Sequence, residues 1–257
     1  MMDSVDFYDR LAAVFDAMTD WEARLEYEGP FLRQLFKAHG VQSVLDAACG
    51  TGGHALAFTD WGLEVAGCDQ SPAMTELARA KAEAENLDVS FFVSSLSDLA
   101  NHATPPFDAV VCLGNSLPHL LTDDELDAGL AGLTSVLRPG GLLVLHNLNY
   151  DKRWREQPRF FAVSNSYVNN REVLVWRFAD YHVDSERITF HIAVFEKSDS
   201  GWSVDVISTL QRPLFRADLE RRLGEAGMTH ITAYGNLAGE PFDPDESPDL
   251  VIIASKS

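Results

Sequence analysis

Residues 43–55 read Ser-Val-Leu-Asp-Ala-Ala-Cys-Gly-Thr-Gly-Gly-His-Ala, and this stretch decides the fold. An apolar, β-branched run ends at Asp46, a loop of small residues follows, and Ala55 opens a segment typical of a helix. Gly50 and Gly52 lack a Cβ atom, so a ligand can approach the backbone of the loop closely. A strand, a glycine loop and a helix in this order expose backbone N–H groups at the helix N-terminus, which is typical of nucleotide-binding sites.

Two kinds of ligand are compatible with this loop. The pattern Gly50-x-Gly52-x-x-Ala55 fits dinucleotide-binding loops, which receive a pyrophosphate. Asp46 argues against that interpretation, because its carboxylate would repel a pyrophosphate and would suit a cation. The stretch from Asp46 to Gly52 resembles the first motif of class I S-adenosylmethionine-dependent methyltransferases, whose cofactor carries a sulfonium, an ammonium and a ribose. The resemblance implies that Asp46, Ala48, Gly50 and Gly52 contact S-adenosylmethionine.

Alternating strand and helix patterns around this stretch predict an α/β fold. Strands are expected at 41–46, 63–68, 89–93, 107–113 and 142–146, and helices at 53–61, 72–85 and 123–138. This alternation is typical of a doubly wound parallel sheet. A helix at 216–226 and strands at 229–234 and 250–255 would complete a mostly parallel, Rossmann-like sheet of seven strands.

A different pattern separates the two parts of this core. Segments rich in Val, Ile, Phe, Trp and Thr follow one another with only turns between them, at 160–168, 172–183, 187–197 and 202–210. They predict an antiparallel β insertion after strand five. Residues 5–38 show helical spacing, interrupted at Gly29-Pro30. We therefore expect an N-terminal helical lid (1–38), a cofactor-binding core (39–150 and 211–257) and a β insertion over the substrate site (151–210).

Composition narrows the class of partner. The chain has 257 residues and a net charge of −19, from 39 acidic and 20 basic residues, so nucleic acid is an unfavourable partner. No apolar run approaches the roughly 18 residues of a membrane span, and the first residues lack a secretory pattern, so we expect a cytoplasmic protein. The three cysteines are not spaced as metal ligands, so we expect no metal. A small-molecule substrate is expected, and a homo-oligomer is compatible with the sequence.

Further cofactor contacts are expected at the ends of the second and third strands. Asp69 follows Gly50 by 19 residues, close to the spacing of about 20 at which an acidic side chain binds ribose hydroxyls. The methyltransferase resemblance implies that Gln70 and Met74 lie beside the ribose and adenine, although Met74 equally fits a plain core position. It also implies that Ser95 and Leu96 border the adenine.

The stretch from Leu113 to His119 reads Leu-Gly-Asn-Ser-Leu-Pro-His, and it should line the crevice at the carboxyl edge of the sheet. It resembles the same region of glycine and sarcosine N-methyltransferases, as does Asn149-Tyr150-Asp151, and the resemblance covers residues 20–151. It implies that Leu113 contacts the cofactor and that Arg24 pairs with the methionine carboxylate, since a guanidinium binds a carboxylate through two hydrogen bonds. Tyr8 and Trp21 could close over the cofactor as an aromatic lid.

The substrate is expected to lie beside this stretch. The substrate-binding residues predicted from the sequence are Asn115, His119, Asn147, Tyr150 and Arg153. His119 and Tyr150 are the candidates for catalysis, because either could accept a proton or orient the substrate. The β insertion could add contacts through Arg153, Arg159 or Arg177.

Leu148 bears on the choice of methyl acceptor. Glycine N-methyltransferases carry an arginine just before Asn-Tyr-Asp that holds the substrate carboxylate, whereas this chain has Asn147-Leu148 before Asn149. Either another arginine, such as Arg153, replaces it, or the acceptor is not a free amino acid. The sequence favours the second alternative, an N-methyltransferase for another small molecule. Glycine or sarcosine N-methylation, an NAD-dependent oxidoreductase and a cofactor-binding regulator without catalysis remain as alternatives.

Overall fold

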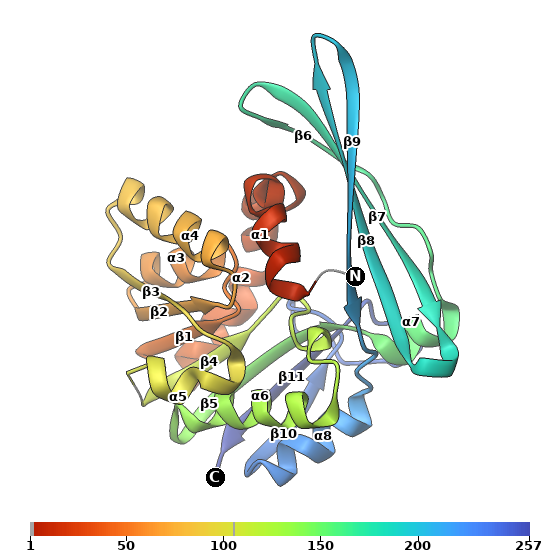
Figure 1. Cartoon of the computed structure of the whole chain (residues 1–257). Helices are drawn as coiled ribbons and strands as arrows, with labels where there is room; N and C mark the ends of the chain where they lie inside the picture. The colour runs from red at the N-terminus through yellow and green to blue at the C-terminus, as the bar shows by residue number, and fades with distance from the viewer. Residues whose placement is uncertain (1–2, 105) are drawn as a thin grey trace.

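Two β-sheets organise the protein (Figure 1). The structure is a computed structural model that describes residues 3–104 and 106–257. The larger sheet has the strand order β10-β11-β5-β4-β1-β2-β3, in which β11 is antiparallel to both neighbours and the other pairs are parallel. The predicted seven-stranded, mostly parallel sheet is therefore confirmed. Its strands are β1 (Ser43–Ala47), β2 (Glu64–Asp69), β3 (Val89–Val93), β4 (Phe107–Cys112), β5 (Leu137–Leu148), β10 (Met228–Tyr234) and β11 (Asp249–Lys256).

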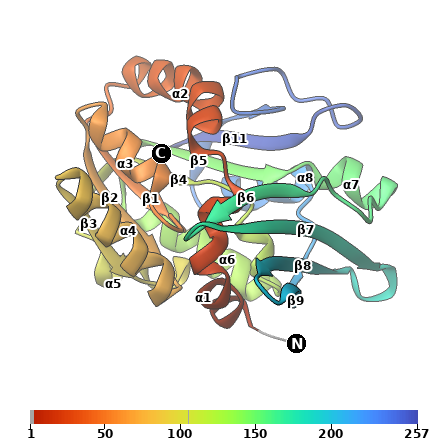
Figure 2. The same ribbon diagram turned by 90° about the horizontal axis from the view of Figure 1, so that it is seen from above.

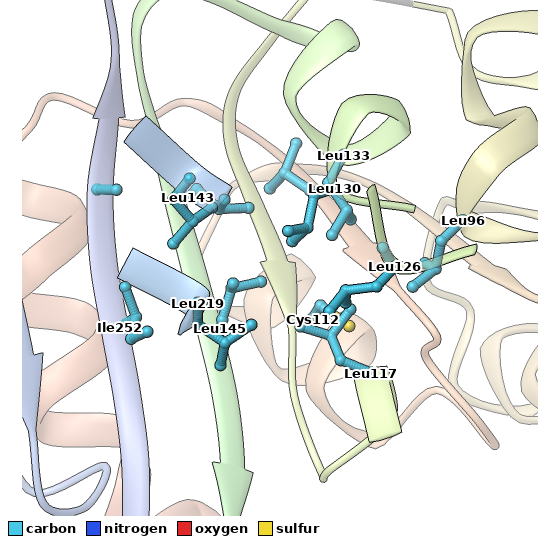
Figure 3. Close-up of a cluster of buried hydrophobic side chains, with 14 of the residues drawn as sticks. Leu96, Cys112, Leu117, Leu126, Leu130, Leu133, Leu143, Leu145, Leu219 and Ile252 are labelled. Atoms are coloured by element: carbon cyan, nitrogen blue, oxygen red, sulfur yellow. The ribbon is translucent and has the colours of Figure 1, made fainter. Parts of the chain in front are cut away.

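Helices cover both faces of this sheet because apolar side chains point alternately to its two sides. In β4, Val110 and Cys112 face one helical layer, whereas Ala109 and Val111 face the other. Figure 3 shows the first interface, where leucines of α6 pack against Cys112 and Leu145. One layer consists of α2 (Trp21–Ala38), α3 (Gly53–Asp60) and α4 (Pro72–Glu85), and the other of α5 (Leu99–His102), α6 (Asp123–Ser135) and α8 (Arg216–Glu225).

The predicted insertion forms a second, antiparallel sheet with the order β6-β7-β8-β9. Its strands are β6 (Ser164–Val168), β7 (Arg171–His182), β8 (Arg187–Ser198) and β9 (Gly201–Gln211). Helix α1 (Ser4–Phe15) lies between this sheet and α4, as the view from above shows (Figure 2). Buried Phe7 and Leu11 of α1 belong to one apolar cluster with Ile192 and Ile207 of the sheet. This cluster fixes α1 and the insertion against each other.

The N-terminal segment differs from the prediction in one respect. Helix α2 continues through Gly29-Pro30, because Pro30 lies on the exposed face, where water can bond to the carbonyl that lacks an N–H donor. Leu32 and Phe36 of α2 are buried in the core under the larger sheet. Only α1 and the short 3₁₀ helix η1 (Asp16–Met18) are then left to act as a lid, and that role stays a prediction.

Several short elements were not expected. Helix α7 (Tyr150–Glu156) follows β5 and is capped by Asn149, whose side chain accepts a hydrogen bond from the backbone N–H of Lys152. Three further 3₁₀ turns occur, at η2 (Leu96–Asp98), η3 (Leu117–His119) and η4 (Val183–Ser185). Strand β5 begins at Leu137, before the predicted start at 142, with a register shift against β4. In the described part of the chain, no helix is both long enough and apolar enough to cross a membrane.

Candidate active site

The glycine loop after β1 is held in a conformation that only certain residues tolerate. Ala48, Gly50 and Gly52 all have positive φ angles, of 63°, 54° and 83°. A Cβ atom on Gly52 would lie 3.0 Å from both Ala78 and Phe91, so glycine is also required there for close packing. The backbone N–H of Gly50 donates to the Asp69 carboxylate over 2.9 Å, which ties the loop to the end of β2.

A first cavity opens at this loop, at the carboxyl ends of β1, β2 and β4. This is the point where the strand order reverses, and it is where open α/β sheets bind ligands. Most of the side chains predicted to bind the cofactor line it, namely Tyr8, Trp21, Arg24, Asp46, Ala48, Gly50, Asp69, Gln70, Ser95, Leu96 and Leu113. We call this space the cofactor cavity.

Two predicted cofactor residues lie outside its lining. Gly52 is the N-cap residue of α3, where it supports the loop by close packing. Met74 is 1% exposed and packs in the apolar cluster shared by α1, α4 and the second sheet. Its side chain fills the core, which agrees with the plain core interpretation of Met74, and the adenine contact stays a prediction.

Asp46 and Asp69 give the cofactor cavity its charge. Burial and the neighbouring Asp69 raise the pKa of Asp46 to about 7, and Asp46 Oδ2 has no hydrogen-bond partner among the described residues. Each oxygen of Asp69 accepts one backbone N–H, from Gly50 or Ser71, both over 2.9 Å, and burial raises the pKa of Asp69. Two buried carboxylates would stabilise a cation and repel a pyrophosphate. The cavity therefore fits a ligand with a sulfonium and a ribose.

Arg24 is positioned by partners that the sequence did not reveal. Its Nε donates to Glu28 over 2.9 Å, and the other Glu28 oxygen lies 2.7 Å from His54 Nε2. Burial lowers the pKa of His54, so the ring is neutral and donates to Glu28. Trp21 lies beneath the Arg24 guanidinium, 5.3 Å from ring centroid to Cζ. The spacing of Arg24 and Glu28 by four residues on one helix was the only local signal for this pair.

A second cavity of about 240 Å³ adjoins the first, and Tyr8, Phe15, Arg24 and Gly114 line both. The second sheet covers it, with side chains from β7 and β8 in its wall. Of the residues predicted to bind substrate, Asn115, Tyr150 and Arg153 line this second cavity and His119 lines the cofactor cavity. We call it the acceptor cavity.

Asn147 and Arg159 do not contribute to either cavity. The side chain of Asn147 is buried on β5, beside the antiparallel strand β11. Arg159 is largely exposed and pairs with Asp180 over 3.0 Å. The cavity linings therefore do not support the predicted contacts of these two residues with substrate, which stay predictions.

Neutral polar side chains are linked by hydrogen bonds where the cavities meet. His119 Nε2 lies 3.1 Å from the Tyr8 hydroxyl and 3.4 Å from Gln211 Nε2. Tyr150 donates to Gln211 over 3.4 Å and accepts from Asn115 over 3.1 Å. Burial lowers the pKa of His119 to about 4, so the ring is neutral at pH 7. With Nε2 accepting, the proton lies on Nδ1, which has no partner among the described residues. Gln211 was missed because it lies at the end of β9, far from the other residues in sequence.

Comparisons with known proteins agree with this geometry. The methyltransferase domain family matches residues 44–141. The glycine/sarcosine N-methyltransferase of Parasynechococcus marenigrum (strain WH8102) is 35% identical over 243 residues, covering 93% of this chain and 80% of that protein. An S-adenosylmethionine-dependent methyltransferase from Clostridium acetobutylicum ATCC 824 superposes with a TM-score of 0.78 at 15% identity, over 98% of both chains.

A structure with the cofactor bound also has this fold. It is that of the amino pentose methyltransferase CalS10 from Micromonospora echinaspora, with a TM-score of 0.74, 21% identity and 95% of both chains covered. The alternatives of an oxidoreductase and of a regulator without catalysis are therefore set aside. The cofactor is S-adenosylmethionine, and the chain belongs to the class I S-adenosylmethionine-dependent methyltransferases.

Proposed function

We propose that this methyltransferase methylates the nitrogen of a small amine that binds in the acceptor cavity. The observation that carries the proposal is the shared wall of the two cavities, where the neutral network of Tyr8, His119 and Gln211 lies. Ligands in the two cavities would meet at this network. The N-methyltransferase relatives support nitrogen as the acceptor atom.

Methyl transfer requires the protein mainly to align the amine with the methyl group of the cofactor. When bound, S-adenosylmethionine supplies an activated methyl group, whose bond to sulfur breaks as its bond to nitrogen forms. The chain holds the amine in line with this bond and excludes water from the junction. Aromatic side chains of Tyr8 and Phe15 form part of both walls and keep the junction apolar around the polar network.

His119 orients the amine rather than storing its proton. A group with a pKa of about 4 holds a proton poorly at pH 7, whereas a neutral imidazole ring still donates through one nitrogen and accepts through the other. Burial also raises the pKa of the Tyr150 hydroxyl, which therefore remains protonated. Both residues present neutral donors and acceptors, so an uncharged amine with a free lone pair is the form they select.

A turnover assay tests this function. S-adenosylhomocysteine release is measured with glycine, sarcosine, dimethylglycine and a panel of uncharged amines, and with hydroxy acids and phenols as oxygen acceptors. Mass spectrometry then identifies the methylated atom. Methylation of oxygen acceptors alone would overturn the proposal. His119→Asn should raise KM for the amine, with a larger change than in the cofactor Kd, because its ring lies where the two cavities meet.

The composition of the chain also bears on the substrate class and the location that we propose. With a net charge of −19, the protein surface disfavours nucleic acid, so a small molecule is the proposed substrate. Cys49, Cys68 and Cys112 are all free thiols, which supports a reducing, cytoplasmic location. A homo-oligomer stays a prediction, which light scattering of the purified protein would test.

A further inference from the structure

Two arginines in the acceptor cavity have no acidic partner. Arg153 of α7 and Arg177 of β7 both line it, and neither forms an ion pair with any described residue. The Arg153 guanidinium lies over the ring of Phe161, 4.8 Å from its centroid, which leaves its edges free for hydrogen bonds. Arg177 Nε is buried and has no hydrogen-bond partner in the described part of the chain.

This arrangement is unusual for a chain with 39 acidic and only 20 basic residues. Elsewhere the chain neutralises a buried guanidinium fully, since Arg222 contacts Asp123, Asp127 and Asp218 at 2.6–2.8 Å. In contrast, no aspartate or glutamate among residues 3–104 and 106–257 lines the acceptor cavity. Burial, and then the charge of Arg153, lower the pKa of Arg177, so the pair is destabilised while it stands alone. A bound anion would relieve that cost.

The volume and the lining of the acceptor cavity indicate what the remainder of the ligand, apart from its anionic group, is like. An apolar cavity of about 150 Å³ holds one benzene molecule. The acceptor cavity, at about 240 Å³, has room for more than a single ring of that size. Much of its wall is apolar, formed by Phe7, Leu11, Phe161, Ile188, Phe190 and Ile192. Glycine would leave this wall unfilled.

We propose that the methyl acceptor carries an oxyanion group and an apolar body as well as its amine, with Arg153 and Arg177 binding the oxyanion. This inference rests on the proposed N-methylation. Glycine N-methyltransferases hold the substrate carboxylate with an arginine at the position of Leu148. In this chain, Arg153 of α7 and Arg177 of the second sheet would bind the oxyanion instead. Guanidinium groups bind carboxylate and phosphate alike, so either oxyanion fits.

Matched pairs of amines test the inference. Each pair has the same amine with and without an oxyanion: phenylalanine and phenylethylamine, glycine and methylamine, O-phosphoethanolamine and ethanolamine. We expect the anionic member of a pair to have a kcat/KM about 10- to 100-fold higher, the worth of charge-assisted hydrogen bonds. The pair with the larger ratio of kcat/KM, anionic member over uncharged member, shows whether the site prefers a carboxylate or a phosphate. A higher kcat/KM for glycine than for phenylalanine would refute the apolar body.

Variants connect the preference to the two arginines. Arg153→Met and Arg177→Met should raise KM for the anionic amine and leave its uncharged partner and the cofactor Kd unchanged. Arg171→Met is the matched control, because Arg171 lies on the same strand as Arg177, is exposed and does not line the cavity. Equal use of both members in all three pairs would overturn the inference while N-methylation stands.

Binding measurements separate failure of the inference from failure of the function. Calorimetry with protein saturated in S-adenosylhomocysteine compares phenylalanine with phenylethylamine. If no amine is methylated, the proposed function fails, but tighter binding of phenylalanine that is lost in Arg177→Met still supports the oxyanion site. Binding without a preference for the anion, or no binding of either probe, overturns it.

Discussion

Asp46 should make cofactor binding depend on pH in a range where most carboxylates do not titrate. Its pKa is raised to about 7 from an ordinary value of 3.8 by burial and by Asp69. A cationic cofactor favours the ionised carboxylate, so binding lowers this pKa and releases a proton. Affinity is therefore complete above about pH 8 and falls as the pH drops through 7.

The magnitude follows from the pKa. When only the ionised form binds well, the affinity falls about tenfold per pH unit well below the pKa. Because half of the Asp46 carboxylate is ionised at pH 7, Kd at pH 5 should be about 50-fold higher than at pH 7. The amino group of the cofactor, with a pKa of about 8, stays largely protonated between pH 5 and pH 7, so it contributes little to the change over that range.

Asp46→Asn tests the same residue through stability. An ionised carboxylate whose folded pKa is raised by about 3 units destabilises the cofactor-free protein at pH 8 by up to about 4 kcal/mol. The variant should therefore have a higher Tm at pH 8 without cofactor and a weaker cofactor affinity. A higher Tm together with a weaker cofactor affinity would show that Asp46 serves binding, whereas a purely structural role would lower the Tm of the variant.

Isothermal calorimetry between pH 5 and pH 8, in buffers of different ionisation enthalpy, measures both Kd and the released proton. The slope should disappear in Asp46→Asn. A constant Kd across this range, or a slope that survives in the variant, would refute the reasoning.

Three further perturbations have definite expected outcomes. A Cβ on Gly132 would lie 1.9 Å from the backbone carbonyl oxygen of Leu96, whereas a Cβ on Gly129 would lie 2.6 Å from the flexible end of the Leu120 side chain. In urea titrations, Gly132→Ala should therefore lower the free energy of unfolding by at least about 2 kcal/mol, and Gly129→Ala should lower it by clearly less. Asp69→Ala should weaken cofactor binding by about 1.5–3 kcal/mol in calorimetry, and an unchanged Kd would contradict its ribose role. Arg222→Met should lower the Tm, because it leaves three carboxylates without their cation, and an unchanged Tm would show that these ion pairs do not stabilise the fold.

The local part of the site could be predicted from the sequence, because it depends on a short continuous stretch. Asp46 and Gly50 are four residues apart, and Asp69 follows at the end of the next strand, so periodicity and spacing were sufficient. Met74 shows the limit of this approach, since the same helical face can point to a ligand or to the core. The packing of α1 decided in favour of the core.

Contacts between distant segments could not be predicted in the same way. His54 meets Glu28 across 26 residues, and Gln211 meets His119 across 92. These contacts depend on where the second sheet and α2 lie on the core, which is set by the sum of many apolar contacts. Arg153 and Arg177 were both candidates for substrate contact, but only the fold places them in one cavity without an acidic neighbour.

Helix α1 has a consequence for the timing of turnover. Tyr8 and Phe15 belong to the walls of both cavities, and the same helix packs against the second sheet through Phe7 and Leu11. Displacing this one helix would expose both ligands to water together, and its return would exclude water from both. Methylated product and spent cofactor would then leave after a shared opening step, with a single rate constant limiting the exchange of the two.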